Sequence, residues 1–461
     1  MNDLRKKAIL VLGAGLSGVA AARLAAREGA SVTLLDEAPL ERLAATFQEL
    51  AGQGICCHAS WQKSSWSEEV SLAIISPGVS PRSLLGRLAA GLSCPVLSEL
   101  AFGAKYCRCP LLAITGSNGK TTAIEMLTCC LNASGVKAIA GGNIGLPLSQ
   151  LAMQEENWDY IAVEVSSFQL EHSDGFQADA AALLNITPDH LDRHENIETY
   201  RDLKLKLLRQ SKESASLVLK AELLADPVVA ESLKGRSLTT FSAGPVKADY
   251  ACQKGSIGSW HAGQFHPLLN CAELSFSGNH NYENAMCVLA LIEGLPVDQV
   301  KAQAALRSFH CGQHRLEKVA EINGVTYVND SKATNVDALI KALEHCGDKK
   351  RKKIILIAGG VDKGCVLEEA KSSLKMYVKQ VLLIGDCRQR LAQAWRNDVK
   401  LLQCPDFDSA MSSASLMAEE GDTVLLSPGC ASFDMFKDYG HRGQSFVEFV
   451  EKLKKESKNE V

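Results

Sequence analysis

Short runs of β-branched and leucine residues alternate along the chain with helical patterns of apolar and polar positions. The first group contains AILVLG, SVTLLD and LAIISPG, which begin at residues 8, 31 and 72. The second contains LLAIT, DYIAVEVSS, AAALLNIT and ASLVL, and the third contains VTYVND, KIILIAGG, QVLLIGD and DTVLLSPG. Strands that alternate with helices in this way are typical of parallel α/β structure. The pattern therefore predicts parallel α/β units, with an alanine-rich helix that begins near Leu16.

The three groups of strands predict three α/β domains. Boundaries near residues 107 and 311 divide the chain into the ranges 1–107, 108–311 and 312–461. A chain of 461 residues is also too long for one ordinary hydrophobic core. In such sheets the loops that leave the carboxyl ends of the strands form the ligand sites, so those loops carry the candidate chemistry.

Composition and charge narrow the class of protein. A formal charge of −4, from 49 basic and 53 acidic residues, gives no general attraction to nucleic acid. We find no apolar run long enough to span a bilayer and no signal peptide before the first strand, so we expect a cytoplasmic protein without a membrane span. The basic run KKRKK directly precedes a strand and is interpreted as its solvated approach. The 16 cysteines are interpreted as reduced thiols, because disulfide frameworks belong to small secreted chains.

The first glycine-rich motif is GAGLSG, with Gly13, Gly15 and Gly18 between a predicted strand and helix. Asp36 closes the next strand, which completes the pattern of a dinucleotide-binding turn. Free N–H groups and a partial positive charge at a helix N-terminus suit a pyrophosphate. The motif alone fits a nicotinamide cofactor, a UDP-sugar or a tight strand–helix turn without a ligand.

The second glycine-rich motif, TGSNGKTT, predicts a phosphate-binding loop of unusual spacing. The standard pattern needs a glycine where this chain has Ile114, whereas the nearest glycine is Gly116. Gly116 and Gly119 permit a sharp turn, so that successive N–H groups face phosphate oxygens. In the standard roles Lys120 would reach the terminal phosphates and the Thr121 hydroxyl would bind Mg²⁺. A glycine-rich turn without a ligand is the alternative for this motif.

Side chains suited to hard metal ions lie at the ends of the next two strands, with Glu164 still inside its strand. They are Glu164, Ser166, Ser167, Gln169, Asp189 and His190. Oxygen ligands with one imidazole suit Mg²⁺ or Mn²⁺ beside phosphates. Zinc at His190 and His194 is disfavoured, because a zinc site needs three or four ligands.

Nine segments, in order along the chain, resemble the Mur ligase family. They are TGSNGKTT, GGNIG, EVSSFQLE, NITPDHLDRH, YRDLK, GNHNYENA, HRLE, NDSKATN and SPGCASFDMFKDYGHRG. Members of this family use ATP to add amino acids to the bacterial cell-wall precursor, and their phosphate loop has the shortened spacing found here. SSFQLE, NDSKATN and the last segment are similar to the branch that adds D-glutamate. Gly429 departs from the alanine expected there and should loosen the loop slightly, and Glu37 is a second departure.

The resemblance implies an architecture and an activity. We expect an N-terminal Rossmann-like domain that binds the UDP substrate, a central ATPase-like domain with a parallel sheet, and a C-terminal Rossmann-like domain that binds the amino acid. The implied reaction joins D-glutamate to UDP-N-acetylmuramoyl-L-alanine at the expense of ATP, through an acyl phosphate, as a cytoplasmic step of peptidoglycan biosynthesis. We expect a monomer with these small molecules as its partners. The alternatives are a folylpolyglutamate-type ligase, an NAD-linked oxidoreductase and a nucleotide-binding switch.

The resemblance also implies roles for individual residues. Those for ATP are Gly116, Ser117, Asn118, Gly119, Lys120, Thr121, Thr122, Asn281, Asn284, Arg315, Asp330 and Lys332. Those for the UDP substrate are Gly15, Leu16, Ser17, Asp36, Glu37, Asn143, Ser167 and Gln169. Those for D-glutamate are Thr334, Lys363, Ser432, Phe433 and Tyr439. The implied catalytic residues are Lys120, Glu164, His190 and Lys204.

Two Mg²⁺ ions are implied beside the phosphates. Thr121 and Glu164 would hold the first, and His190 and Lys204 the second. A lysine ammonium repels Mg²⁺, and the family resolves this by adding CO₂ to the amine, which makes a carbamate with carboxylate-like oxygens. We therefore expect a carbamate on Lys204, in YRDLK.

Overall fold

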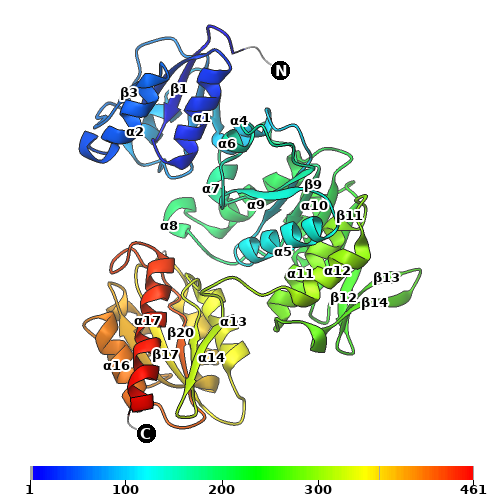
Figure 1. Ribbon diagram of the computed structural model, residues 1–461, viewed down its shortest axis with the longest axis vertical. Helices are drawn as coiled ribbons and strands as arrows, with labels where there is room; N and C mark the ends of the chain where they lie inside the picture. Colours follow the sequence, from blue (N-terminus) through cyan, green and yellow to red (C-terminus); the bar gives the residue numbers. More distant parts are fainter. Residues whose placement is uncertain (1–3, 363, 460–461) are drawn as a thin grey trace. The chain divides into compact units, whose positions relative to one another are not determined.

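The computed structural model of the chain describes residues 4–362 and 364–459. Within these residues the strands form three β-sheets, each covered by helices (Figure 1). The chain folds into two compact units, one made of residues up to Ile186 with Glu198–Phe309, the other of Thr187–Ile197 with the residues from His310 onward. The predicted α/β class is confirmed, and the domain boundaries at residues 107 and 311 stay a prediction. None of the helices in the described ranges is long and apolar enough to cross a membrane.

The first sheet is parallel, with the strand order β3-β2-β1-β4-β5. Its strands are β1 (Ala8–Leu12), β2 (Ser31–Leu35), β3 (Cys56–His58), β4 (Leu72–Ile75) and β5 (Val96–Ser98). Its helices are α1 (Leu16–Arg27), α2 (Leu40–Gly52), α3 (Leu84–Ala90) and α4 (Glu99–Ala104). The predicted helix near Leu16 is thus confirmed as α1. Because the strand order reverses between β1 and β4, the loop after β1 lies at the topological switch point, where ligands of such sheets bind.

The second sheet, also in the first unit, has the order β14-β13-β12-β11-β10-β9-β6-β8-β7. Its strands are β6 (Leu111–Thr115), β7 (Ala138–Gly142), β8 (Tyr160–Glu164), β9 (Ala180–Leu183), β10 (Ser216–Lys220), β11 (Leu238–Ser242), β12 (Tyr250–Gln253), β13 (Ser256–His261) and β14 (Gln264–Asn270). Its helices are α5 (Lys120–Ala133), α6 (Leu148–Leu151), α7 (Ser167–Leu170), α9 (Ile197–Gln210), η1 (Ala221–Ala225), α10 (Pro227–Ser232), η2 (Cys271–Glu273), α11 (Asn279–Ile292) and α12 (Gln299–Ser308).

Strands β12, β13 and β14 pair antiparallel, which the parallel α/β prediction did not include. Two tight turns connect them. Lys254 and Gly255 have φ of 48° and 76°, and Ala262 and Gly263 have φ of 49° and 79°. Positive φ at both turn residues is the geometry of the two-residue hairpin whose twist matches its strands. The sheet therefore ends in a hairpin extension rather than in another strand–helix unit.

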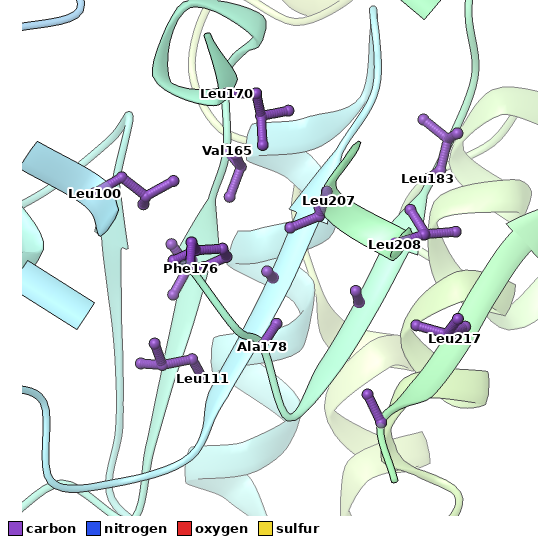
Figure 2. Close-up of a cluster of buried hydrophobic side chains, with 14 of the residues drawn as sticks. Leu100, Leu111, Val165, Leu170, Phe176, Ala178, Leu183, Leu207, Leu208 and Leu217 are labelled. Atoms are coloured by element: carbon purple, nitrogen blue, oxygen red, sulfur yellow. The ribbon is translucent and has the colours of Figure 1, made fainter. Parts of the chain in front are cut away.

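The core of the second sheet explains why its strands read as continuous apolar runs. Figure 2 shows Leu183 and Leu217, from two neighbouring strands, near Leu207 and Leu208 of α9, and Leu111, from the next strand of the sheet, beside Phe176 and Ala178 in the same cluster. Helices α5, α11 and α12 contact one another and cover the strands from the other side. Side chains alternate between the two faces of a strand, so a sheet covered on both faces needs apolar residues at successive positions.

The third sheet lies in the second unit, with the order β15-β16-β20-β17-β18-β19. Its strands are β15 (Glu317–Ile322), β16 (Val325–Asn329), β17 (Ile354–Gly359), β18 (Val378–Ile384), β19 (Leu401–Gln403) and β20 (Thr423–Leu426). Its helices are α8 (Leu191–His194), α13 (Val336–Cys346), η3 (Leu367–Ala370), α14 (Lys371–Tyr377), α15 (Arg388–Trp395), α16 (Phe407–Met417) and α17 (Tyr439–Asn459). Only β15 is antiparallel to its neighbour. Separate apolar clusters lie on the two faces, one under α13, α14 and α15 and the other under α16 and α17.

Candidate functional site

The phosphate loop joins β6 to α5 and is shaped by its glycines. Gly119, which precedes α5, has φ of 84°, in the left-handed region that favours glycine. A Cβ built on Gly119 would lie 2.5 Å from Oδ1 of Asn284. Both facts require glycine at this position. They also place Asn284, one of the two asparagines predicted to bind ATP, beside the loop.

Asn185, two residues after β9, holds the phosphate loop from the neighbouring strand. The Ser117 N–H donates to the Asn185 carbonyl at 3.1 Å. The Asn118 N–H donates to Asn185 Oδ1 at 2.9 Å, and Asn185 Nδ2 donates back to the Asn118 carbonyl at 3.1 Å. We did not predict a role for Asn185. The available signal was an amide side chain at the carboxyl end of the strand that pairs with β6, within NITPDHLDRH.

Two lysine side chains donate to the same carbonyl oxygen of the phosphate loop. Lys120 Nζ lies 2.8 Å from the Gly116 oxygen and 2.9 Å from the Ser117 oxygen. Lys204 Nζ, from α9, lies 2.8 Å from the same Gly116 oxygen. Lys204 is only 1% exposed, and its ammonium lies 4.4 Å from the centre of the Tyr200 ring. A lysine is almost never buried so fully unless its charge is paired.

Glu164 ends β8, next to the last residues of β6, and is buried. Its Oε1 accepts a hydrogen bond of 2.7 Å from Asn143 Nδ2, and its backbone oxygen accepts one of 2.9 Å from the Asn143 N–H. Among the described residues, its Oε2 is buried without a hydrogen-bond partner. A buried carboxylate oxygen without a donor is costly, and a cation would satisfy it. This donor set fits the predicted Mg²⁺ site.

The loop after β1 is closed by acidic side chains. Asp36 Oδ2 accepts a hydrogen bond of 2.6 Å from the Ala14 N–H, and its Oδ1 accepts one of 2.7 Å from the Ala38 N–H. Glu37 Oε1 accepts one of 2.9 Å from the Leu85 N–H in the first turn of α3. The Asp36 carboxylate therefore holds the loop after β1, whereas Glu37 binds the start of α3. The predicted contact of both with the UDP substrate stays a prediction. Leu16 is 82% exposed and open to a ligand.

Ser166 and Gln169 form a capping box at α7. The Ser166 hydroxyl accepts a hydrogen bond from the Gln169 N–H at 3.3 Å, and Gln169 Oε1 accepts one from the Ser166 N–H at 3.0 Å. Gln169 is buried, so its side-chain oxygen is already used within the fold. Its predicted role toward the UDP substrate stays a prediction, as does that of the buried Ser167.

His190 lies in the short segment of the second unit that interrupts the first unit in sequence. It has φ of 56°, and its N–H donates to Asp189 Oδ1 at 2.9 Å. Asp189 Oδ2 accepts a hydrogen bond of 3.1 Å from Asn335 Nδ2, and Asn335 also caps α13. The segment is thus anchored to α13. Because Thr121, Glu164 and Lys204 belong to the first unit, the joint metal site with His190 stays a prediction.

The loops after β16 and β20 bring together three of the predicted residues in the second unit. Asp330 is buried and accepts hydrogen bonds from the Ser427 hydroxyl at 2.9 Å and the Leu316 N–H at 3.2 Å. Burial raises the pKa of the Asp330 carboxyl to about 7, against the hydrogen bond from Ser427. Lys332 Nζ lies 3.7 Å from the centre of the Tyr439 ring. A predicted ATP contact and a predicted D-glutamate contact are therefore neighbours.

Arg442 connects these two loops and was missed by the sequence analysis. It is buried, its Nε donates to the Ser331 hydroxyl at 3.0 Å, and its NH1 and NH2 each donate to the Cys430 carbonyl at 3.2 Å. Burial lowers its pKa to about 10, so the guanidinium stays charged at neutral pH. The available signal was the arginine of GHRG in the last motif.

Of the residues predicted to bind D-glutamate, the structure describes all but Lys363. Ser432 is buried, whereas Phe433 is 72% exposed at the tip of the same loop. Gly429 has φ of 66°, so glycine suits the turn and does not simply loosen it as we had expected. Thr334 is half-buried beside the β16 loop, and Lys363 lies outside the described residues.

Comparisons with known proteins identify the family. Residues 114–292 match the family model described as the Mur ligase middle domain, and residues 314–430 match the Mur ligase, glutamate ligase domain. Residues 11–48 match an NAD(P)-binding Rossmann-like domain. These matches identify an ATP-dependent ligase, and the chain belongs to the Mur ligase family.

Two relatives share one name. The UDP-N-acetylmuramoylalanine--D-glutamate ligase of Pelotomaculum thermopropionicum is 36% identical over 99% of this chain and 100% of its own length. The ligase of the same name from Thermoanaerobacter pseudethanolicus is 35% identical over 98% of this chain and 100% of its own. The MurF ligase of Thermotoga maritima, solved in complex with ADP, has a TM-score of 0.63 over 100% of both chains at 17% identity, which shows the shared fold.

Proposed function

We propose that this chain joins D-glutamate to UDP-N-acetylmuramoyl-L-alanine and converts ATP to ADP and phosphate, as a monomer in the cytoplasm. The names of the full-length relatives support this activity. The structural observation that carries it is the gathering of Lys120, Lys204 and Glu164 around one phosphate loop. A regulatory nucleotide switch has no need of a buried second lysine beside its phosphate loop.

The reaction begins with two anions that must meet. The substrate carboxylate attacks the γ-phosphorus of ATP, the bond to the β-phosphate oxygen breaks, and ADP leaves. The D-glutamate amine then attacks the acyl phosphate, phosphate leaves from the tetrahedral intermediate, and the amine gives up a proton. Positive charge fixed between the anions favours the first step, and positioning of the reactants favours both.

Lys120 supplies fixed positive charge in this scheme. In this structure its ammonium lies against two carbonyl oxygens of its own loop. The phosphates of ATP would compete for those N–H donors, because hydrogen bonds between charged groups are stronger than those to a carbonyl. Asn185 would hold the loop open to phosphate while Lys120 turns toward it.

Glu164 and Thr121 are the residues that would hold one Mg²⁺ ion, and His190 and Lys204 the second. When bound, Mg²⁺ polarises phosphoryl oxygens and neutralises the charge that develops on them. The unsatisfied Oε2 of Glu164 is the observation that supports the first site. Asn143 keeps the carboxylate in place through Oε1, so that Oε2 faces its ligand in a fixed orientation.

A carbamate on Lys204 reconciles its burial with a metal-binding role. The uncharged amine adds to the carbon of CO₂ and loses a proton, which gives an N-carboxylate. The carbamate keeps one N–H, so the hydrogen bond to the Gly116 oxygen survives the modification.

Other loops are assigned to the UDP part of the first substrate and to D-glutamate. We assign the UDP part to the loop after β1, where Gly15 and Leu16 are open, and D-glutamate to the loop that carries Ser432 and Phe433. Ser432 would donate a hydrogen bond to a carboxylate of D-glutamate. Thr334, Lys363 and Tyr439 complete this part of the proposal.

The test is ADP release measured with one component omitted at a time, and with D- against L-glutamate. We expect release that requires UDP-N-acetylmuramoyl-L-alanine, D-glutamate and Mg²⁺ together, with the amide product identified by mass spectrometry. ADP formation that is indifferent to D-glutamate would overturn the assignment. A preference for L-glutamate would favour the folylpolyglutamate-type alternative, and nicotinamide turnover would favour the oxidoreductase.

A further inference from the structure

A pair of buried thiols lies directly behind the loop assigned to D-glutamate. All 16 cysteines lie in the described part of the chain and are free thiols. Cys387 precedes α15, Cys430 follows β20, and their Sγ atoms are 3.3 Å apart. Both side chains are buried, with 7% and 2% of the residue exposed. The two sulfur atoms are therefore already in contact in the reduced protein.

The thiol pair is built into the D-glutamate loop by further contacts. Asp434, in the same loop as Ser432, accepts a hydrogen bond of 2.9 Å from the Asp386 N–H through Oδ2. The Cys387 N–H donates to the Gly360 carbonyl at 3.0 Å, and Ala431 pairs with Val361 through two backbone hydrogen bonds. Movement of either sulfur would therefore be passed to the backbone on both sides of Ser432.

We infer that Cys387 and Cys430 are an oxidation site at which a peroxide forms a disulfide that regulates D-glutamate binding. This inference rests on the proposed function for its consequence, but not for the bond itself. A disulfide needs the sulfur atoms about 2.05 Å apart, so they must approach by roughly 1.2 Å. Such a shift beside Ser432 matters, because a misplacement of about 1 Å can cost about a hundredfold in rate.

The chemistry balances with a peroxide as the oxidant. The Cys387 thiolate attacks one peroxide oxygen, the O–O bond breaks, and the protein gains a sulfenic acid while hydroxide takes up a proton as water. The Cys430 sulfur then attacks the Cys387 sulfur, loses its proton, and expels the hydroxyl group as a second water. Two thiols lose two electrons in total, and a dithiol such as dithiothreitol returns them by exchange.

The environments of the two sulfurs suit these unequal roles. The hydrogen bond from the Cys430 thiol lowers the pKa of Cys387, which favours its thiolate as the attacking group. The hydrogen bond to Cys387, together with burial, raises the pKa of Cys430 well above its ordinary value. A second thiol pair, Cys252 and Cys271, has its sulfurs 3.7 Å apart, but burial raises the pKa of Cys271 to about 11. That pair belongs to the first unit, whereas the D-glutamate loop belongs to the second.

The test treats the reduced full-length protein with hydrogen peroxide, blocks the remaining thiols and maps disulfides by mass spectrometry. We expect a peptide that links Cys387 to Cys430, and a KM for D-glutamate that rises about tenfold or more while the KM for ATP stays nearly constant. Dithiothreitol should restore the original KM. Cys387→Ser should keep its activity and resist the oxidant, whereas Cys252→Ser should remain sensitive. Cys387→Ala is a second variant if the serine proves unstable.

Each outcome decides one part of the inference. Inactivation without a Cys387–Cys430 link would overturn the oxidation site. A link that leaves the KM for D-glutamate unchanged would overturn its regulatory role. The mapping needs no activity, so a reduced protein that ignores D-glutamate would count against the proposed function and leave the disulfide result intact.

Discussion

The two glycine-rich loops of the first unit have similar local sequences but are held in opposite ways. In the loop after β1, the Asp36 carboxylate accepts the N–H groups of Ala14 and Ala38. In the loop after β6, the neutral amide of Asn185 holds Asn118 from both sides, and Lys120 and Lys204 add positive charge. Glycine spacing therefore explains the turn, whereas the surrounding side chains decide which ligand the turn suits.

The difference matters for the charge that each loop presents to an anion. The Asp36 carboxylate, held against the first loop from the end of β2, weakens the attraction of that loop for phosphate, so binding there must draw on other contacts, such as the exposed Leu16. The second loop concentrates cations and keeps its acid, Glu164, on the neighbouring strand with one oxygen unsatisfied. Of these two loops, we therefore expect the second to be the one at which the phosphoryl group is transferred.

Removal of the positive charge from the second loop should have the largest effect. We expect Lys120→Ala to lower kcat/KM about a thousandfold, because charge stabilisation of this kind is worth roughly that much when one group is lost. The measurement is the initial rate of ADP release as a function of ATP concentration, which gives kcat/KM. Lys137→Ala removes an exposed lysine from the same domain and should change little. Equal losses of kcat/KM in both variants would show that the positive charge in the phosphate loop has no special role.

The second lysine tests the carbamate. Lys204→Ala should lose about a hundredfold or more in rate, since both a metal ligand and a loop contact disappear. Short carboxylic acids such as formate or acetate should restore part of the activity, because they supply the missing carboxylate oxygens. Lys206→Ala, on the same helix, removes an ion pair of 2.8 Å with Asp174 and should stay near wild type. Absence of any loss in Lys204→Ala would end the carbamate proposal.

In the loop after β1, we expect a substitution of Gly18 to destabilise the fold by steric overlap. A Cβ on Gly18 would overlap the Gly13 carbonyl oxygen and press on the Ser76 hydroxyl, whereas one on Gly15 would meet nothing within 4 Å. Gly18→Ala should therefore lower the free energy of unfolding by about 3 kcal/mol, the range of a serious backbone clash. Gly15→Ala should be nearly neutral. Urea unfolding of both variants provides the comparison, and similar stabilities would contradict the observed packing.

A buried carboxyl lies between the two loops in sequence and links their domains. Glu99 begins α4, accepts a 2.6 Å hydrogen bond from the Ser149 N–H, and is 1% exposed. Burial raises the pKa of its carboxyl from 4.5 to about 7. Its contribution to stability is thus fully present below pH 4.5 and is lost as the pH rises through 7, at a cost of up to about 3 kcal/mol.

Glu99→Gln isolates that contribution, because the amide keeps the acceptor oxygen and cannot ionise. We expect the variant to gain stability relative to wild type as the pH rises from 5 to 8. Urea unfolding at several pH values measures the difference, and Glu156→Gln, at an exposed position, is the control. A difference that does not change with pH would show that Glu99 ionises freely in the folded protein.

The sequence predicted the strands well where burial on both faces makes them continuously apolar, as in LLAIT and KIILIAGG. It missed the β13–β14 hairpin, because SIGSWH and QFHPLLN contain polar residues and many exposed or half-buried positions and are not continuous apolar runs. The phosphate loop was visible because its function depends on neighbours in sequence. Asn185 and Arg442 were not, because each acts across a sheet edge, on residues 67 and 111 positions away.

Exchange of the side chains that hold the two glycine-rich loops, Asn185 and Asp36, gives the most specific test and the smallest expected effect. Asn185→Asp would keep the acceptor for the Asn118 N–H, lose the donor to its carbonyl, and bring a negative charge to the phosphate loop. We expect the KM for ATP to rise about tenfold, equivalent to roughly 1.4 kcal/mol. Asp36→Asn would set an NH₂ group against one of two backbone N–H donors and lower stability by about 1 kcal/mol, without changing the KM for ATP. The two measurements are the KM for ATP and the free energy of unfolding of each variant. If both variants changed the KM for ATP equally, the charge of the side chain that holds each loop would not distinguish the two loops. Their ligands would then have to be assigned on other grounds.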